Sequence, residues 1–384
     1  MNDTLERFAA QKLADLERAE LRRSLQPTTR SSRARTERNA KALISFACND
    51  YLGLSQHPEV VAASCAATQK YGTGAGASRH VSGNHPLYAA LEERLAKLKG
   101  SEDAVVFGSG YLVNIGVIPA LVGPEDLVLI DELSHACLFA GARLARATVL
   151  EFAHNDVADA ARLLAEHRGR HRHVLVLTEG VFSMDGDRAP LADLLDLTQR
   201  HDAWLMTDDA HGLGVVGGGR GSAVVGAEPL PIPLQMGTLS KAVGAYGGYL
   251  CASRTVAELI RNRARSLIYT TGLPPGVLAA AHKALEIIAT DHALVARPLE
   301  NARLFAALRG MPGPASAIVP IVLGTPARAL EASRALEARG FLVVAIRPPT
   351  VPEGTARLRL AFSAAHSGAD IERLATAIDS VPQP

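Results

Sequence analysis

The chain has 384 residues, of which 40 are Lys or Arg and 39 are Asp or Glu, and its formal net charge is +1. This length predicts two or three domains with a sizeable buried core. The balanced charge excludes a global field that would attract nucleic acid or an acidic membrane, so an anionic ligand has to be recognised locally.

The cysteines and the N-terminus predict an unexported protein. The four cysteines (Cys48, Cys65, Cys137 and Cys251) are scattered and lack the close pairs of zinc or redox motifs, which is typical of small core residues in a reducing compartment. The N-terminus is charged and amphipathic, and no run of about 18 apolar residues could span a membrane. We therefore expect a cytoplasmic protein with no metal site and neither a membrane nor a nucleic-acid partner.

Two helices and one loop are predicted in the first hundred residues. Apolar residues recur at roughly helical spacing in residues 3–25 (Leu5, Phe8, Leu13 and Leu16), which predicts a surface helix. The polar, Arg-rich residues 28–39 are predicted to form a loop. Residues 86–100 predict a second helix, with Pro86 in the first turn and Gly100 as the C-terminal cap.

Short apolar runs then alternate with helical or loop stretches. The runs are AVVF (104–107), LVLI (127–130), VLVLT (174–178), WLMTD (204–208), LQMGT (234–238) and YLCA (249–252). This alternation predicts an α/β fold with a mostly parallel central sheet and helices on both faces. After about residue 290 the runs IVPIVL, FLVVAI and RLRLAF predict a smaller α+β domain. We expect an N-terminal helix and arm (1–45), a large domain (46–285) and a small domain (286–384).

Open α/β sheets bind ligands at the carboxyl ends of their strands, so the residues that follow these runs are the candidates for a site. One of them, GLGVVG at 212–217, matches the spacing of a dinucleotide-binding motif. The glycines that follow it up to Gly221 cannot open a helix, and no acidic residue stands about 20 positions further on. We interpret the segment as a glycine-rich loop.

Three other segments leave alternatives open when each is read alone. DDAHG (208–212) is a turn, a metal site, or an acid and an imidazole that serve a bound ring, although one Asp and one His are few metal ligands. FGSGYLVN (107–114) is either a plain β–α turn or a helix start whose free N–H groups bind phosphate. His135 is either an ordinary histidine or an aromatic ring that lies over a ligand.

Lys241 lies in GTLSKAVGAYGGYL (237–250), which contains no acidic residue. A buried ammonium without a carboxylate partner is costly, so it reaches water, lowers its pKa or becomes covalently bonded. One ligand accounts for all these segments. A phosphorylated pyridine aldehyde requires anion donors, a stacking ring, a carboxylate for its ring nitrogen, a donor to its phenolic oxygen, and a lysine. The pattern therefore predicts pyridoxal 5'-phosphate (PLP) bound to Lys241.

The sequence resembles the α-oxoamine synthases, a family of fold type I PLP enzymes, over essentially the whole chain. The resemblance is carried by NDYLGLSQHPEV, SRHVSGNHPLYAALE, HNDV, TEGVFSMDGD, DDAHGLGVVG, SKAVGAYGG and IRPPTVPEGTARLRLAFSAAH. HVSG and AIRPPTVP favour the oxononanoate branch, which condenses L-alanine with a pimeloyl thioester, carried on CoA or on acyl carrier protein, in biotin biosynthesis. The alternative is a sister synthase of the glycine C-acetyltransferase, 5-aminolevulinate synthase or serine palmitoyltransferase type.

The resemblance implies roles for individual residues. Lys241 carries PLP, Asp208 pairs with the pyridine nitrogen, His211 bonds the phenolic oxygen and His135 stacks on the ring. The remaining cofactor contacts come from Gly110, Tyr111, Ser183 and Thr238, and from Thr271 of the other subunit of a homodimer, with Thr270 as its alternative.

The substrate residues follow from the same resemblance. Arg359 binds the carboxylate of the amino acid, with Asn49 nearby, and a planar guanidinium suits that function. Arg22, Arg347 and Thr350 line the acyl end. Arg79 replaces a Gly of some relatives, and we expect it to be a solvated surface residue.

Two rival classes remain. One is a nucleotide-binding dehydrogenase that uses GLGVVG, which a titration with NADH would identify. The other is a catalytically silent partner subunit, against which the intact Lys241, Asp208 and His211 argue.

Overall fold

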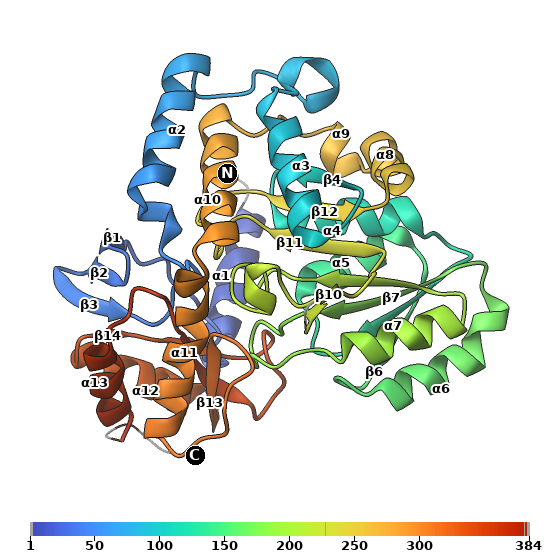
Figure 1. Ribbon diagram of the computed structural model, residues 1–384. Helices are drawn as coiled ribbons and strands as arrows, with labels where there is room; N and C mark the ends of the chain where they lie inside the picture. Colours follow the sequence, from blue (N-terminus) through green and yellow to red (C-terminus); the bar gives the residue numbers. More distant parts are fainter. Residues whose placement is uncertain (1–2, 227, 380, 382–384) are drawn as a thin grey trace.

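The computed structural model describes residues 3–226, 228–379 and 381 (Figure 1). The α-helices are α1 (Asp3–Arg18), α2 (Pro58–Tyr71), α3 (Leu87–Lys99), α4 (Gly110–Leu121), α5 (Ala136–Ala145), α6 (Val157–His167), α7 (Leu191–Arg200), α8 (Arg254–Arg263), α9 (Arg265–Ile268), α10 (Pro275–Thr290), α11 (His292–Leu308), α12 (Pro326–Ala338) and α13 (Gly368–Ile378). The strands are β1 (Thr29–Ser32), β2 (Arg35–Arg38), β3 (Lys41–Ser45), β4 (Asp103–Phe107), β5 (Leu127–Asp131), β6 (Thr148–Phe152), β7 (Val174–Glu179), β8 (Trp204–Asp208), β9 (Val224–Val225), β10 (Glu228–Pro229), β11 (Leu234–Thr238), β12 (Gly248–Ala252), β13 (Ile318–Gly324), β14 (Phe341–Leu342), β15 (Val344–Ile346) and β16 (Ala356–Ala361). None of the described helices is long and apolar enough to cross a bilayer.

The central sheet has seven strands in the order β4-β12-β11-β8-β7-β5-β6. Only β12 runs against its neighbours β4 and β11, so the prediction of a mostly parallel sheet is confirmed. All six predicted strands are present. The edge strand β6 was not predicted, because its TVLEF sequence is only half buried and has no continuous apolar run.

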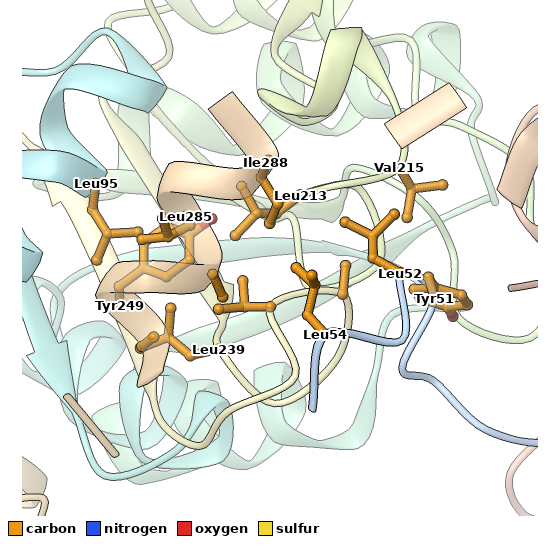
Figure 2. Close-up of a cluster of buried hydrophobic side chains, with 14 of the residues drawn as sticks. Tyr51, Leu52, Leu54, Leu95, Leu213, Val215, Leu239, Tyr249, Leu285 and Ile288 are labelled. Carbon is orange, nitrogen blue, oxygen red and sulfur yellow. The ribbon is translucent and has the colours of Figure 1, made fainter. Parts of the chain in front are cut away.

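Side chains alternate between the two faces of this sheet, and each face is covered by helices. On one face Val128, Ile130 and Leu177 pack with α4, α5 and α8. On the other face Leu127 and Leu129 pack with α6 and α7. The helices α3 and α10 cover that second face at the β4 end, where they join the largest core cluster (Figures 1 and 2). Figure 2 shows Tyr51, Leu52 and Leu54 entering this cluster beside Leu285 and Ile288 of α10.

The helix predicted for residues 86–100 is confirmed as α3. Gly100 ends it in the left-handed conformation, with φ 69° and its N–H bonded to the carbonyl of Ala96. Pro86 is the N-cap and not the first helical residue. The glycine-rich segment 212–217 forms turns and a short 3-10 segment instead of opening a helix, as expected.

The two predictions for the N-terminal segment are wrong in part. α1 ends at Arg18 rather than near residue 25, and Glu20 has φ 56°, outside the helical region. Residues 28–39 contain the antiparallel hairpin β1–β2, and not only a loop. The prediction failed because charged residues surround a single buried side chain, Thr36, in β2.

The C-terminal segment forms its own three-stranded antiparallel sheet, β13-β16-β15, with α11, α12 and α13. The predicted strand FLVVAI divides into β14 and β15, and β14 pairs in parallel with β3 of the N-terminal arm. The blue hairpin therefore lies beside the red elements in Figure 1. We propose that 46–285 and 286–384 are the large and small domains, with the arm 1–45 added to the small one.

Candidate active site

A cavity of about 180 Å³ lies at the carboxyl ends of β7, β8 and β11. Its lining residues are Ser109, Gly110, Tyr111, His135, Cys137, Glu179, Ser183, Asp208, Ala210, His211, Met236, Thr238, Ser240 and Lys241. The structure thus brings eight of the predicted cofactor residues to one place. They are separated by more than a hundred positions in the sequence and meet because parallel strands end at one edge of the sheet.

Asp208 is the last residue of β8 and is 5% exposed. The amide of Asn114, on α4, donates to Oδ2 of Asp208 at 3.0 Å, and the backbone N–H of Ala210 donates to Oδ1 at 3.0 Å. The same Asn114 amide donates to Sγ of Cys137 at 3.0 Å. Asp208 is therefore held as an oriented acceptor at the cavity.

Lys241 follows β11 in a tight turn, in which the Gly244 N–H bonds the Lys241 carbonyl at 2.8 Å. Gly244 has φ 68°, and a Cβ there would lie 2.3 Å from the backbone N of Ser55, so this turn requires glycine. Burial lowers the pKa of Lys241, although the charges of Asp208 and Glu179 oppose the shift. Within the described chain the Lys241 ammonium has no recorded ion pair, so its amine is available at the cavity.

The N-terminus of α4 faces the same cavity. Ser109 caps the helix by accepting the N–H of Leu112, which leaves the N–H groups of Gly110 and Tyr111 without a partner in the helix. β12 lies close to this helix start, and only glycine fits there: a Cβ on Gly248 would be 2.6 Å from the backbone N of Gly110. The Thr238 hydroxyl donates to the carbonyl of Gly247 at 2.9 Å. These groups form a compact anion site at a helix start.

The surroundings of the two histidines of the cavity favour their neutral forms. Burial, followed by the Lys241 and Arg359 charges, lowers the pKa of His211 well below its ordinary value. Burial also lowers the pKa of His135, although Asp208 opposes this shift. His135 is the N-cap of α5, where its Nδ1 accepts the Cys137 N–H at 3.2 Å. A neutral ring that accepts at Nδ1 carries its proton on Nε2.

A buried polar chain connects His211 to Arg359. The hydroxyl of Tyr51 lies 2.7 Å from Nδ1 of His211 and accepts from Nη2 of Arg359 at 3.2 Å. Arg359 also donates to the Ser183 carbonyl at 2.5 Å and to Oδ1 of Asn49 at 3.1 Å. Arg359 and Asn49 therefore lie together beside the cavity, as predicted.

A second cavity of about 650 Å³ adjoins the first and shares His135 and Ser183 with it. Thr350 lines this second cavity, as does Arg23, whose Nη2 donates to Oγ1 of Thr350 at 3.2 Å. Arg22 instead pairs with Glu17 and is not among the lining residues, so its predicted place at the acyl end is not reproduced. The cause is local, because α1 ends at Arg18 and the following chain is not helical. In this segment Arg22 turns back to Glu17, whereas Arg23 reaches Thr350. Arg347 donates to the carbonyl of Glu20.

Thr270 and Thr271 do not line either cavity. Thr271 is exposed and forms a bridge with Ser78.

Arg79 differs from the expectation of a solvated surface residue. Its side chain is 10% exposed, pairs with Glu92 at 2.6 Å and lies over the ring of Tyr88. A buried carboxylate on a neighbouring helix explains this position, because it neutralises the guanidinium in the interior.

Sequence reasoning missed three residues of the site: Tyr51, Asn114 and Glu179. Glu179 ends β7, and its carboxylate accepts the N–H of His135 at 2.6 Å and that of Ser183 at 3.1 Å. Burial, and then the neighbouring Asp208, raises the pKa of Glu179 well above its ordinary value. Its position directly after a strand was the available signal. Tyr51 and Asn114 gave none, since a loop tyrosine and a helix asparagine have many ordinary roles.

A model of the aminotransferase class I and II family matches residues 41–378. The fold and this match define the chain as a fold type I PLP enzyme, and it belongs to that family. Solved structures agree, since a serine palmitoyltransferase from S. paucimobilis covers 99% of this chain (98% of its own) with a TM-score of 0.92 and 29% identity.

Sequence relatives define the branch. The 8-amino-7-oxononanoate synthase of Methylobacterium nodulans is 57% identical, covering 99% of this chain and 98% of the relative. That of Methylorubrum populi is 59% identical, covering 98% and 95%. A structure with this name from Francisella tularensis has a TM-score of 0.75 and 26% identity over 88% of this chain and 96% of its own. The chain belongs to the 8-amino-7-oxononanoate synthases, which are PLP-dependent acyltransferases.

The residues present fit this cofactor. The N–H groups of Gly110 and Tyr111 at the start of α4 have no partner in the helix and suit a phosphate, and Lys241 offers an amine without a carboxylate ion pair among the described residues. Asp208 is an oriented, buried carboxylate. No cluster of His, Cys, Asp and Glu among the described residues could hold a metal ion.

Proposed function

We propose that the protein condenses L-alanine with a pimeloyl thioester, carried on CoA or on acyl carrier protein, to 8-amino-7-oxononanoate, CO2 and the free thiol. This reaction is a step of biotin biosynthesis. The observation that supports this proposal most directly is that the two cavities adjoin and share His135 and Ser183. The smaller one offers the amine, the carboxylate and the anion site, and the larger one is open to a long acyl chain.

In this proposal PLP supplies an electron sink for the charge that develops at Cα of alanine. Lys241 provides the amine that bonds the cofactor and, once displaced, takes the Cα proton at Nζ. Burial favours its neutral form, and only that form can accept the proton. Asp208 pairs with the pyridine nitrogen. Asn114 holds its carboxylate in place for this contact.

His211 donates to the phenolic oxygen from Nε2. The Tyr51 hydroxyl lies 2.7 Å from Nδ1 of His211 but 3.3 Å from Oδ1 of Asn49, so its hydrogen goes to Nδ1, and a neutral histidine that accepts there is protonated at Nε2. His135 stacks on the ring, with its proton on Nε2 for the same reason. Gly110, Tyr111 and Thr238 hold the phosphate, and Ser183 lines the cofactor.

Arg359 binds the carboxylate of alanine, with Asn49 beside it. Its bonds to Ser183, Asn49 and Tyr51 fix the plane of the guanidinium, which favours a bidentate contact. Thr350 and Arg23, which line the larger cavity, serve the acyl end, and Arg347 directly precedes Pro348 of the same lining.

The active unit is a homodimer in this proposal, in which Thr271 of one subunit, or Thr270, reaches the phosphate of the other. Both threonines lie outside the cavities of their own chain. Large apolar or aromatic side chains are exposed on the segments around them and at the site, namely Val81, Tyr111, Tyr246 and Tyr269. Such a surface suits a second copy of the chain.

An absorbance spectrum of the purified protein tests the proposal. We expect a visible band of PLP that shifts on addition of L-alanine and turnover when pimeloyl-CoA follows. Glycine and L-serine are the matched controls, because the likeness to serine palmitoyltransferase leaves a sister synthase as the alternative. Faster turnover with serine or glycine than with alanine would identify the protein as such a sister synthase. Absence of a PLP band would refute the assignment to a PLP-dependent reaction.

A further inference from the structure

Outside the cofactor cavity, one histidine bridges two carboxylates that belong to different loops. Nδ1 of His154 lies 3.0 Å from Oδ1 of Asp131, and Nε2 lies 2.8 Å from Oδ2 of Asp187. The ring also meets Phe182 edge-on, with centroids 4.3 Å apart. An ionised carboxylate only accepts hydrogen bonds, so a ring that bridges two of them donates from both nitrogens and is an imidazolium. The Asn155 amide, 3.2 Å from Nε2, is closer to the same Asp187 oxygen, to which it donates at 2.7 Å.

The bridged loops are the two that wall both cavities. Asp131 ends β5 and begins the loop that delivers His135. Asp187 lies on the loop after β7 that carries Ser183, and its carbonyl accepts the Phe182 N–H at 3.0 Å, which closes that loop. From the inner side Glu179 joins the same loops through the N–H groups of His135 and Ser183.

We propose that His154 is a positioning residue: as an imidazolium it fixes the His135 loop against the Ser183 loop and so sets the shape of the cofactor and acyl cavities. Without this cation the two carboxylates would lose a shared donor and repel each other. The proposal deepens the assignment of the PLP site. It does not depend on which amino acid or acyl donor reacts.

The charged surroundings favour the imidazolium. Two carboxylates at the end of β5, those of Asp131 and Glu132, face His154. The Glu132 carboxylate accepts the backbone N–H of His154 at 3.0 Å. From the β7 loop come Asp187 and, one residue on, Arg188, which donates to the Ser222 carbonyl. From α6, Asp159 accepts the Ala153 N–H. Burial opposes the charge, but the hydrogen bonds of Asp131 and Asp187 outweigh it and raise the pKa of His154 to about 10.

The first test is the protonation state itself, read from nitrogen-15 NMR of histidine-labelled protein at about pH 8.5, two units above the ordinary histidine pKa. We expect one imidazolium with both nitrogens protonated, which disappears in His154→Gln. Only neutral histidines in the wild-type protein would overturn the proposal.

The second test is PLP binding by His154→Gln, with His292→Gln as the control, since His292 is exposed at the start of α11. Loss of a residue that positions a binding group typically lowers affinity by about tenfold or more. We therefore expect the PLP concentration at half-saturation to rise about tenfold, with an unchanged circular dichroism spectrum. The wild-type affinity should fall as pH rises toward 10, and the variant should lack that step. PLP affinity within twofold of wild type would overturn the proposal.

Asp187→Asn is measured in place of His154→Gln if that variant does not fold, with the same expectation and the same refuting result. The half-exposed Asp187 side chain makes this substitution milder. Failure of the proposed condensation is recognised separately, because it would appear in turnover with alanine while the imidazolium and the PLP affinity stayed as expected.

Discussion

Removing the hydroxyl of Tyr51 tests the polar chain that joins the cofactor side of the site to the substrate side. Tyr51→Phe keeps the ring, which is 1% exposed in the core, and removes a single oxygen atom. Arg359 keeps its bonds to Ser183 and Asn49 but loses the third, and Nδ1 of His211 loses its 2.7 Å partner.

Each unsatisfied buried group costs about 1–3 kcal/mol. Because Arg359 retains two bonds, we take the lower part of that range for each group and expect about 2 kcal/mol in total. Only the share of Arg359, about 1 kcal/mol, acts on the alanine carboxylate, so at about 1.4 kcal/mol per factor of ten half-saturation by L-alanine should rise roughly fivefold. PLP should remain bound, since its phosphate and ring contacts come from other residues.

The assay is a titration of the PLP absorbance with L-alanine, and Tyr71→Phe is the control because Tyr71 is exposed. The half-saturating concentration of pimeloyl-CoA should change less than that of alanine, because the hydroxyl contacts Arg359 and His211 and Tyr51 is not among the residues that line the larger cavity. Alanine affinity within threefold of wild type would refute the reasoning, because it would show that Arg359 holds its geometry without Tyr51.

Four further outcomes are expected. Lys241→Ala should lose the visible band of covalently bound PLP together with turnover, and retained turnover would exclude Lys241 as the cofactor lysine. Arg359→Ala should raise the KM of alanine far more than that of the thioester, and an unchanged alanine KM would place its carboxylate elsewhere. Lys99→Met removes the cation from a fully buried ion pair of 2.6 Å, so the free energy of unfolding in urea should fall by about 3–5 kcal/mol, whereas the exposed Lys97→Met should leave it unchanged. The pKa of His154 is raised in the folded state to about 10, so its stabilisation is complete below about pH 6.5 and is lost as pH rises through about 10. The stability gap between wild type and His154→Gln should narrow over that window, and a constant gap would contradict the charge.

Apart from β6, the strands of the central sheet were predictable from local pattern, and so was the place where eight of the proposed cofactor residues meet. Continuous apolar runs mark buried parallel strands, and a ligand site lies where such strands end. The contact between β3 and β14 was not predictable, since it joins segments about 300 positions apart through only two residue pairs. Arg22 and Arg23 show a similar limit. Both are cations in the same short segment, and only the path of the chain after α1 decides which one reaches Thr350.

The two adjacent aspartates of DDAHG lie on opposite faces of the sheet, one at the cofactor cavity and one in a buried ion pair. Asp208 points to the face of the sheet covered by α4 and meets Asn114, at the cofactor cavity. Asp209 points to the opposite side, where it pairs with Lys99 of α3 and accepts the N–H of Ser222. Successive residues at the end of a strand face opposite ways.

The family resemblance named Asp208 for the ring, but the strand pattern alone does not distinguish the two carboxylates, because β8 is buried on both faces and shows no alternation. The structure makes the difference physical. The carboxylate of Asp209 is paired with the buried ammonium of Lys99, whereas Asp208 accepts hydrogen bonds from two neutral donors, the Asn114 amide and the Ala210 N–H, so we propose that Asp208 is the carboxylate available to the ring. Support on one face of the sheet thus leaves the other face free for catalysis.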